Sequence, residues 1–336
     1  MTTLISIIIP TFNVEKYIAE CLNSLINQSF SDFEIIVVDD CSTDSTLEIV
    51  KYFANKDCRI RFFENDKKVG SGGSRNFGLK QAKGKYIQFV DGDDWLDRNT
   101  LEKLYTCAEK FNAHIVIFKV LSFFDSSKHF FKEDYLTIPV LEKFNNKLFN
   151  STEIFDEMFE ISVSPINKLY LRLFLEDVGA CFPENIIHQD NPFFYQVFCE
   201  AKRIYLLDEY FYNRRIWKGS ITTLRDDTEL GTVEIVEKIL QVFLNNGLYN
   251  KFKISLLNRL IFKLRNRYNF VGNDFKKDYY FRVKLKLIKF ISEYELYDDF
   301  IECLDVKNRI FFENVLYSNS FDEFIKDYIV IENLII

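Results

Sequence analysis

The sequence has few of the residues that build metal centres and disulfide frameworks. Its 336 residues include three histidines and seven cysteines, and no two cysteines form a Cys-x-x-Cys pair. An odd number of widely spaced cysteines argues against both a structural zinc site and a set of disulfides. We therefore expect a chain that works in the reducing environment of the cytoplasm.

Long apolar runs are also absent. No segment approaches the roughly 18–20 consecutive apolar residues of a membrane-spanning helix. The first residues lack the basic and then apolar pattern of a secretory signal, so export is not expected. Apolar residues still make up 48% of the chain, which excludes global disorder and supports a packed core. The length predicts about two domains, or one domain with a large appendage.

The net charge of −7 disfavours general binding of nucleic acids. The charge is uneven: residues 251–290 hold twelve Lys or Arg and two Asp, whereas 291–336 hold three Lys or Arg and eleven Asp or Glu. Apolar residues at helical spacing, such as Leu256, Leu260 and Leu264, and then Phe281, Leu285 and Ile288, run through the basic block. The block therefore predicts either contact with an anionic membrane or a helical bundle that pairs it with the acidic block, within the chain or in a homodimer.

Strand and helix patterns alternate over the first ~95 residues. Buried strands are expected at Leu4–Ile9, Phe33–Val38, Ile60–Phe63 and Tyr86–Val90, with Pro10 ending the first. Helical patterns are expected at 17–25, 45–53, 74–82 and 101–111, with a further strand at 113–120 and mainly helices from about 226. This order predicts an α/β fold of the doubly wound type with a mostly parallel sheet.

Polar clusters follow these strands at the places where ligands bind in such sheets, beyond the carboxyl ends of the strands. The clusters are Thr11 and Asn13, Asp39 and Asp40, Gly70 to Arg75, and Asp91 to Asp94. Because they come from four separate segments and would meet at one sheet edge, we expect them to line a common crevice.

Asp91 and Asp93 alternate just past a buried strand, so both carboxylates could reach one hard cation whose other ligands come from a diphosphate. The alternative is a solvated acidic turn. Arg75 suits a diphosphate contact, with an exposed surface cation as the alternative. A dinucleotide fingerprint at Gly70–Arg75 is rejected, because the polar stretch 64–68 separates it from the preceding strand.

Two further acids have a functional and a structural interpretation. Asp40 could accept from a base N–H or a ribose hydroxyl, or it could cap a helix. Asp190 could act as a general base, or it could be a capping residue of a helix that starts near Pro192.

These segments, in this order, resemble glycosyltransferase family 2, whose members have the GT-A fold. The matching segments are Ser6–Asn13 with Glu15, Glu34–Asp44, Gly73–Asn76 and Phe89–Asp94, and more weakly Asn167–Tyr170, Phe182–Glu184, Gln189–Asp190 and Arg214–Thr222. The resemblance covers roughly two-thirds of the chain and ends near residue 225.

The resemblance implies a role for each matched residue. Pro10, Thr11 and Asp40 would hold the nucleotide base, with Asn13 and Glu15 nearby. Arg75 would approach the diphosphate, and Asp91 and Asp93 would bind ribose and a divalent metal (Mn²⁺ or Mg²⁺). Asp190 would be the catalytic base. The family usually has Glu before the base, where this chain has Gln189.

The implied activity is inverting transfer of a sugar from a nucleotide-sugar, a UDP-sugar in our interpretation, to a hydroxyl of a glycan acceptor. The acceptor would belong to cell-surface polysaccharide or glycolipid synthesis, which could include a lipid-linked glycan at the inner face of the plasma membrane. We expect a nucleotide-sugar-binding half at 1–100, an acceptor-binding half at 101–225 and a helical region at 226–336. The alternatives are a nucleotidyltransferase, although 10–19 lack its lysine- and glycine-rich loop, and a non-catalytic sugar-nucleotide-binding protein.

Overall fold

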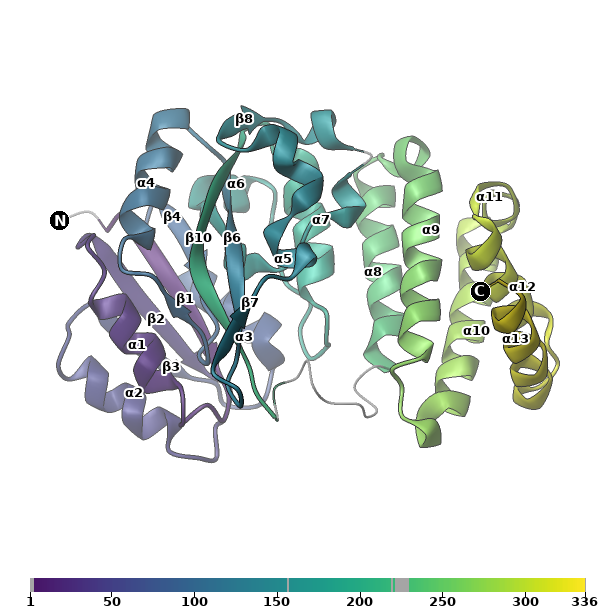
Figure 1. Ribbon diagram of the computed structural model, residues 1–336, viewed down its shortest axis with the longest axis horizontal. Helices are drawn as coiled ribbons and strands as arrows, with labels where there is room; N and C mark the ends of the chain where they lie inside the picture. Colours follow the sequence, from purple (N-terminus) through teal and green to yellow (C-terminus); the bar gives the residue numbers. More distant parts are fainter. Residues whose placement is uncertain (1–2, 156, 219, 221–229, 336) are drawn as a thin grey trace. The chain divides into compact units, whose positions relative to one another are not determined.

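The chain folds into two compact units, Met1–Thr222 and Thr223–Ile336 (Figure 1). The computed structural model describes residues 3–155, 157–218, 220 and 230–335. The expected domain boundary at 225/226 and the last matched residue, Thr222, lie outside the described residues.

The first unit is built on a mixed sheet flanked by helices (Figure 1). Its strand order is β3-β2-β1-β4-β9-β6-β10-β5, with β7 beside β6 and β8 beside β10. The strands are β1 (Ile5–Thr11), β2 (Phe33–Asp39), β3 (Ile60–Glu64), β4 (Tyr86–Phe89), β5 (Trp95–Leu96), β6 (Ile115–Phe124), β7 (His129–Phe131), β8 (Lys147–Phe149), β9 (Lys168–Leu171) and β10 (Ile204–Ile216). The helices are α1 (Ile18–Ile26), α2 (Thr46–Ala54), α3 (Gly70–Gln81), α4 (Thr100–Phe111), α5 (Asp134–Thr137), α6 (Arg172–Asp177) and α7 (Asp190–Glu200).

The sheet is parallel from β3 to β4, and β6 and β10 are parallel to each other. Strand β9 lies between the two groups and is antiparallel to both β4 and β6. This is the predicted α/β class, and the four predicted N-terminal strands are confirmed.

Each face of β1 packs on different helices, as expected for a strand that is apolar at nearly every position. Ile7 and Ile9 belong to a core that also contains buried residues of α1, α2 and α4. Ile8 faces the other way and meets Gly78 of α3, where a Cβ atom would overlap the Ile8 side chain. A helix packed this closely holds the loop before it against the carboxyl end of the sheet.

Pro10 does not end the first strand, contrary to expectation. It pairs with Val38, and β1 continues to Thr11. Along β1, the last pair with β4 joins Ile8 to Phe89, so Pro10 lies beyond it. Alternate residues of a strand bond to opposite neighbours, so the N–H that proline lacks would point to the β4 side of β1, where pairing has already ended. Pro10 therefore costs the strand no hydrogen bond.

The longest strand, β10, has no counterpart among the expected elements. It has 13 residues and runs beside β6, with register shifts between Leu207 and Tyr210 and between Tyr210 and Tyr212. Asp208 and Glu209 lie in this shifted part of the strand. A bulge removes the regular alternation by which a strand is recognised in sequence.

The second unit is a bundle of helices. They are α8 (Thr232–Asn245), α9 (Tyr249–Tyr268), α10 (Lys276–Tyr294), α11 (Tyr297–Cys303), α12 (Val306–Tyr317) and α13 (Phe321–Ile335), with α8 and α9 side by side (Figure 1). The predicted apolar face of α9 is confirmed, because Leu256, Leu260 and Leu264 are fully buried. No helix among the described residues is long and apolar enough to cross a membrane.

Helix α10 exposes the apolar residues that its spacing pattern had singled out. Leu285 is 67% exposed, and Phe281 and Ile288 are also exposed, whereas Val283 and Leu287 are fully buried. Helix α10 has apolar residues on two faces, so spacing alone could not tell which one packs.

Several lysines of the basic block pair with acids inside this unit. Lys286 contacts Glu234 and Glu237, and Lys289 also contacts Glu237. Lys253 pairs with Asp299 in the acidic block. These contacts fit a bundle that uses its basic face internally, and the membrane contact stays a prediction of the sequence alone.

Glu237→Gln should lower the free energy of unfolding by about 1–3 kcal/mol, because a buried charged acceptor of two lysines is lost. Burial raises the pKa of Glu237, but the bonds from Lys286 and Lys289 outweigh burial, so the folded-state pKa lies below the ordinary 4.5. The ionised Glu237 therefore contributes its full stabilisation above about pH 4.5, the ordinary pKa. This contribution is lost as the pH falls through the lower pKa of Glu237 in the folded protein.

Urea unfolding followed by far-UV circular dichroism, which reports on the helices, checks this at pH 7 and at pH 4. Glu293→Gln is the control, because Glu293 is exposed and lies 3.6 Å from Lys289. A loss for Glu237→Gln no larger than for the control would contradict the prediction.

Candidate active site

The loop after β1 is held by the loop that precedes α2. The backbone N–H of Asn13 donates to Ser42 Oγ (3.0 Å), and Asn13 Oδ1 accepts from the N–H of Thr43 (2.8 Å). Glu15 Oε2 accepts from the N–H of Ser45 (2.9 Å). The side chains of Asn13 and Glu15 therefore hold the loop after β1 in place, beside the residues predicted to bind the base.

Thr11 and Asp39 form the floor of this part of the site. Thr11 Oγ1 donates to Asp39 Oδ1 (3.2 Å), and both residues are buried at the carboxyl ends of β1 and β2. Asp39 also accepts from the backbone N–H of Ser42 (2.8 Å). The carboxyl ends of the two strands thus meet where the polar clusters were expected to converge.

Asp40 holds the start of α3. Its carboxylate accepts from the backbone N–H groups of Val69 and Gly70 (2.9 Å each) and from Asn65 Nδ2 (2.9 Å). These bonds satisfy N–H groups that a helix start leaves without partners. They explain why α3 begins at Gly70 and not near Ser74, despite the low helix propensity of glycine.

The glycines of α3 allow a second segment to approach closely. A Cβ at Gly72 would overlap the carbonyl oxygen of Pro183 and lie 2.8 Å from Cγ of Gln189. One turn further on, Asn76 exchanges two hydrogen bonds with the backbone of Phe182 (2.8 and 2.9 Å). Gln189 donates to Ser71 Oγ (2.7 Å). Residues 182–189, which lead into α7, are thereby fixed against α3.

Arg75 of α3 and Asp91, which follows β4, form an ion pair. Arg75 Nη2 lies 2.7 Å from Asp91 Oδ1, and the arginine side chain is 6% exposed. The alternative of a surface cation for Arg75 is therefore wrong. In the part of the chain that the structure describes, Nε of Arg75 is buried and has no hydrogen-bond partner. A buried guanidinium with a spare donor is suited to a phosphate oxygen.

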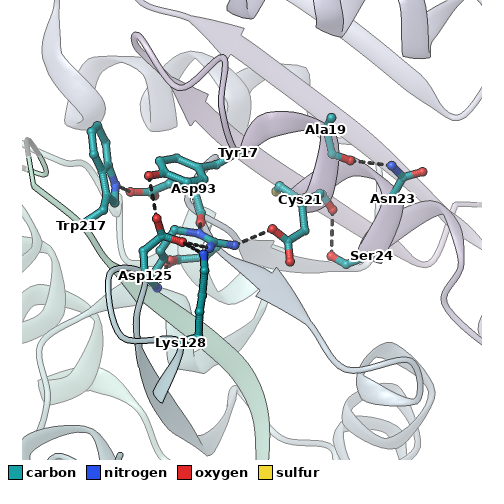
Figure 2. Close-up of polar contacts among 12 residues, drawn as sticks. Tyr17, Ala19, Cys21, Asn23, Ser24, Asp93, Asp125, Lys128 and Trp217 are labelled. Atoms are coloured by element: carbon teal, nitrogen blue, oxygen red, sulfur yellow. Dashed lines mark hydrogen bonds and ion pairs between the residues drawn. The ribbon is translucent and has the colours of Figure 1, made fainter. Parts of the chain in front are cut away.

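Asp93 lies in a half-buried position under an aromatic pair. The indole N–H of Trp217 donates to Asp93 Oδ2 (2.7 Å), and the Trp217 ring lies 5.1 Å from that of Tyr17 (Figure 2). Burial raises the pKa of Asp93, and the negative charge of Asp91 raises it further. Because burial and a neighbouring negative charge disfavour the ionised form of Asp93, a nearby cation would stabilise it.

Asp94, the next acid, faces into the protein. Its carboxylate accepts from the Tyr212 hydroxyl (2.7 Å) and from the backbone N–H of Arg215 (2.7 Å). Burial raises the pKa of Asp94 well above its usual range, and the charges of Asp93 and Asp91 add to this. Asp94 thus ties the acidic turn to β10.

Arg215 connects three parts of the site. It lies in the weakly matching segment Arg214–Thr222 but was not itself predicted as a site residue. Its Nε–H donates to the backbone oxygen of Asp93 (2.9 Å), and its two terminal nitrogens pair with Asp125 (2.7 Å) and Glu20 (2.5 Å). Its guanidinium also lies over the rings of Tyr17 and Trp95, 4.7 Å from each centroid. Asp125 in turn contacts Tyr17 and Lys128 (Figure 2).

Asp190 is the first residue of α7, and Gln189 takes the N-cap position. The helix therefore begins two residues before Pro192, the expected start. Asp190 Oδ1 accepts from Asn191 Nδ2 (2.9 Å). Burial raises the pKa of Tyr170 on β9 well above its usual range; the charge of Arg75 acts against this, and that of Asp190 adds to it.

No group of three or more His, Cys, Asp or Glu residues that could hold a metal ion occurs among the described residues. Asp91 and Asp93 supply two carboxylates, and Asp94 is directed to Tyr212 and Arg215. A divalent ion here would need further ligands from a bound diphosphate or water, as Mg²⁺ commonly does.

This architecture is that of the GT-A fold, in which a parallel half-sheet ends in an acidic turn. The model of the family Glycosyl transferase family 2 matches residues 6–177, just over half of the chain. The chain belongs to this family.

Two bacterial relatives are similar to part of the chain. Glycosyltransferase GlyA of Streptococcus pneumoniae is 32% identical over 230 residues, which cover 65% of this chain and 31% of GlyA. Poly(ribitol-phosphate) beta-N-acetylglucosaminyltransferase TarS of Staphylococcus aureus is 34% identical over 215 residues, 62% of this chain and 35% of TarS. The chain thus spans about a third of the length of these relatives.

Two solved structures share the fold. Residues 1–349 of TarS in complex with UDP-GlcNAc have a TM-score of 0.59 at 24% identity, covering 88% of this chain and 89% of that one. The mannosyltransferase PcManGT of Pyrobaculum calidifontis, in complex with GDP-Man and Mn²⁺, has a TM-score of 0.51 at 13% identity and covers 97% and 86%.

Arg215→Lys should destabilise the first unit by about 1–3 kcal/mol, because the Arg215 side chain is only 4% exposed and an ammonium cannot reproduce the three-way contact of its planar guanidinium. Urea unfolding followed by tryptophan fluorescence measures it, since both tryptophans lie in this unit. Arg214→Lys is a matched control, because the neighbouring Arg214 is more exposed and its one ion pair among the described residues is with Glu133. Equal effects of the two changes would contradict a special role for Arg215.

Proposed function

We propose that the chain transfers a sugar from a UDP-sugar to a hydroxyl of a glycan acceptor, with inversion at the anomeric carbon. The observation that carries the proposal is the buried Arg75, paired with Asp91 at the carboxyl end of β4 and left with a spare N–H donor. This is the arrangement that a nucleoside diphosphate requires, a cationic fork beside an acid that can turn to a ribose or a metal.

The donor would lie along the carboxyl ends of β1, β2 and β4. Pro10 and Thr11 would face the base, Asp40 would support the pocket through the start of α3, and Asn13 and Glu15 would keep its rim in place. The UDP-GlcNAc of the TarS complex belongs to that protein, and the shared fold supports a UDP-sugar for this chain.

A divalent metal fits the residues present. Asp91 and Asp93 would hold it. Burial and, after it, the charge of Asp91 raise the pKa of Asp93, and a bound cation would stabilise its ionised form. When bound, the metal would stabilise the charge that develops on the departing diphosphate. The Mn²⁺ in the PcManGT complex supports this choice, and Mg²⁺ would satisfy the same carboxylates.

Asp190 would accept the proton of the acceptor hydroxyl. The hydroxyl oxygen then forms its bond to the anomeric carbon while the bond from that carbon to the diphosphate oxygen breaks, and a single displacement inverts the configuration. Arg75 would stabilise the departing diphosphate by hydrogen bonds, and the N-terminus of α7 would favour the ionised form of Asp190.

The acceptor would be a growing cell-surface polysaccharide or a glycolipid. The relative TarS is a poly(ribitol-phosphate) beta-N-acetylglucosaminyltransferase, which supports a surface polymer as the acceptor. Membership of a glycosyltransferase family disfavours the nucleotidyltransferase alternative.

Asp93→Asn should nearly abolish transfer, because it removes one of two carboxylates proposed for the metal with no change in size. Thermal unfolding should show a folded protein. The assay measures UDP release with acceptor and Mn²⁺, and again with a chelator. Asp32→Asn is the control and should keep full activity, because Asp32 is exposed and lies at the amino end of β2, away from the carboxyl ends of the strands. Wild-type turnover by Asp93→Asn under chelator would disprove the metal role.

Asp190→Asn should reduce turnover by roughly 10²- to 10⁴-fold, the usual contribution of a general base. Affinity for UDP, measured by calorimetry, should barely change, because the base serves the acceptor. A parallel loss of UDP affinity would instead place Asp190 in the donor site or in the fold.

A further inference from the structure

Trp217, the residue that follows β10, holds the side chain of Asp93. Its indole N–H donates to Asp93 Oδ2 at 2.7 Å. Two residues earlier, Arg215 Nε–H donates to the backbone oxygen of the same acid at 2.9 Å. The end of β10 therefore holds both the main chain and the carboxylate of Asp93, from positions 122 and 124 residues further along the chain.

The indole of Trp217 is itself held in place by Tyr17. The two ring centroids are 5.1 Å apart, with 55° between the ring planes (Figure 2). The Tyr17 hydroxyl donates to Asp125 Oδ2 (3.3 Å), and the guanidinium of Arg215 lies 4.7 Å from the centroid of the Tyr17 ring. Because Tyr17 is fixed on two sides, the indole N–H keeps its direction toward Asp93 before any ligand binds.

The donor on Asp93 differs in charge from the donor on Asp91. Asp91 faces the guanidinium of Arg75, which balances its negative charge. The indole N–H of Trp217 is a neutral donor, so it holds an oxygen of Asp93 without cancelling the carboxylate charge. Arg215, the cation that contacts the backbone of Asp93, is paired with two other carboxylates. Asp93 therefore keeps a negative charge that a cation can use.

We propose that Trp217 is a positioning residue of the metal site: its indole N–H holds Asp93 Oδ2, so that the carboxylate is oriented for a divalent cation. The inference rests on the proposed role of Asp93 as a metal ligand. The indole nitrogen is a donor only, so Trp217 acts through the acid and does not bind the metal itself. Carboxylates that bind metals are commonly oriented by such a second donor, and its loss lowers metal affinity by about 10- to 100-fold.

The test is calorimetric titration of MnCl₂ into the full chain in the presence of saturating UDP, for two variants of Trp217. Trp217→Phe removes the N–H and keeps a ring against Tyr17, whereas Trp217→Leu removes both. If the N–H positions the acid, both variants should bind Mn²⁺ about 10- to 100-fold more weakly than the wild type. Their affinity for UDP in the presence of a chelator should not change, because the indole acts on the metal ligand alone.

Trp95→Phe is the matched control. It removes the same indole group from the other tryptophan of the chain, whose ring packs on Phe123 and Phe130. This variant should bind Mn²⁺ as the wild type does.

An equal loss of Mn²⁺ affinity in both Trp217 variants, with unchanged UDP affinity, would support the inference. Wild-type Mn²⁺ affinity in folded Trp217→Phe would overturn it, because the ring and not the N–H would then matter. A parallel loss of UDP affinity under chelator, or failure of Trp217→Phe to fold, would assign Trp217 a structural role and also overturn it.

Asp93→Asn, titrated in the same way, separates the inference from the proposed function. If this variant binds Mn²⁺ as tightly as the wild type, the metal role of Asp93 is wrong and the inference fails with it. If Asp93→Asn loses Mn²⁺ affinity while Trp217→Phe keeps it, the metal role stands and only the role of Trp217 is wrong.

Discussion

Three carboxylates within four residues at the end of β4 impose the constraint on which the site depends. Asp91, Asp93 and Asp94 repel one another, and burial makes each charge more costly. The structure resolves this by giving each acid a different partner: Arg75 from α3, Trp217 after β10, and Tyr212 within β10. The placement of α3 and β10 around the acidic turn follows from that need.

The N-terminal half of the fold and its acidic turn could be read from the sequence because their signals are local. Buried parallel strands give continuous apolar runs, and the polar residues follow directly after them. The contacts of Arg215 and Trp217 could not be foreseen in this way, since their partners are 90 or more residues away and β10 carries a bulge that breaks its alternation. On α10, two apolar faces left the choice of the packed one to tertiary contacts.

Helix α3 joins the two halves of the proposed reaction. Its first turn is held by Asp40 from the donor side, and its glycines and Asn76 hold the segment that leads to Asp190. Arg75 lies between these contacts on the same helix. A rigid element that carries both sets of contacts keeps donor and acceptor groups in register, which is the main source of rate in transfers of this kind.

The close contact at Gly72 has a consequence for the width of the catalytic gap. The carbonyl oxygen of Pro183 and the side chain of Gln189 rest directly on the backbone of α3 at Gly72. Any residue larger than glycine would act as a wedge, lifting Pro183 and Gln189 and with them the start of α7. In the proposed reaction, the distance between the leaving diphosphate and the attacking hydroxyl would therefore depend on the absence of a Cβ atom at Gly72.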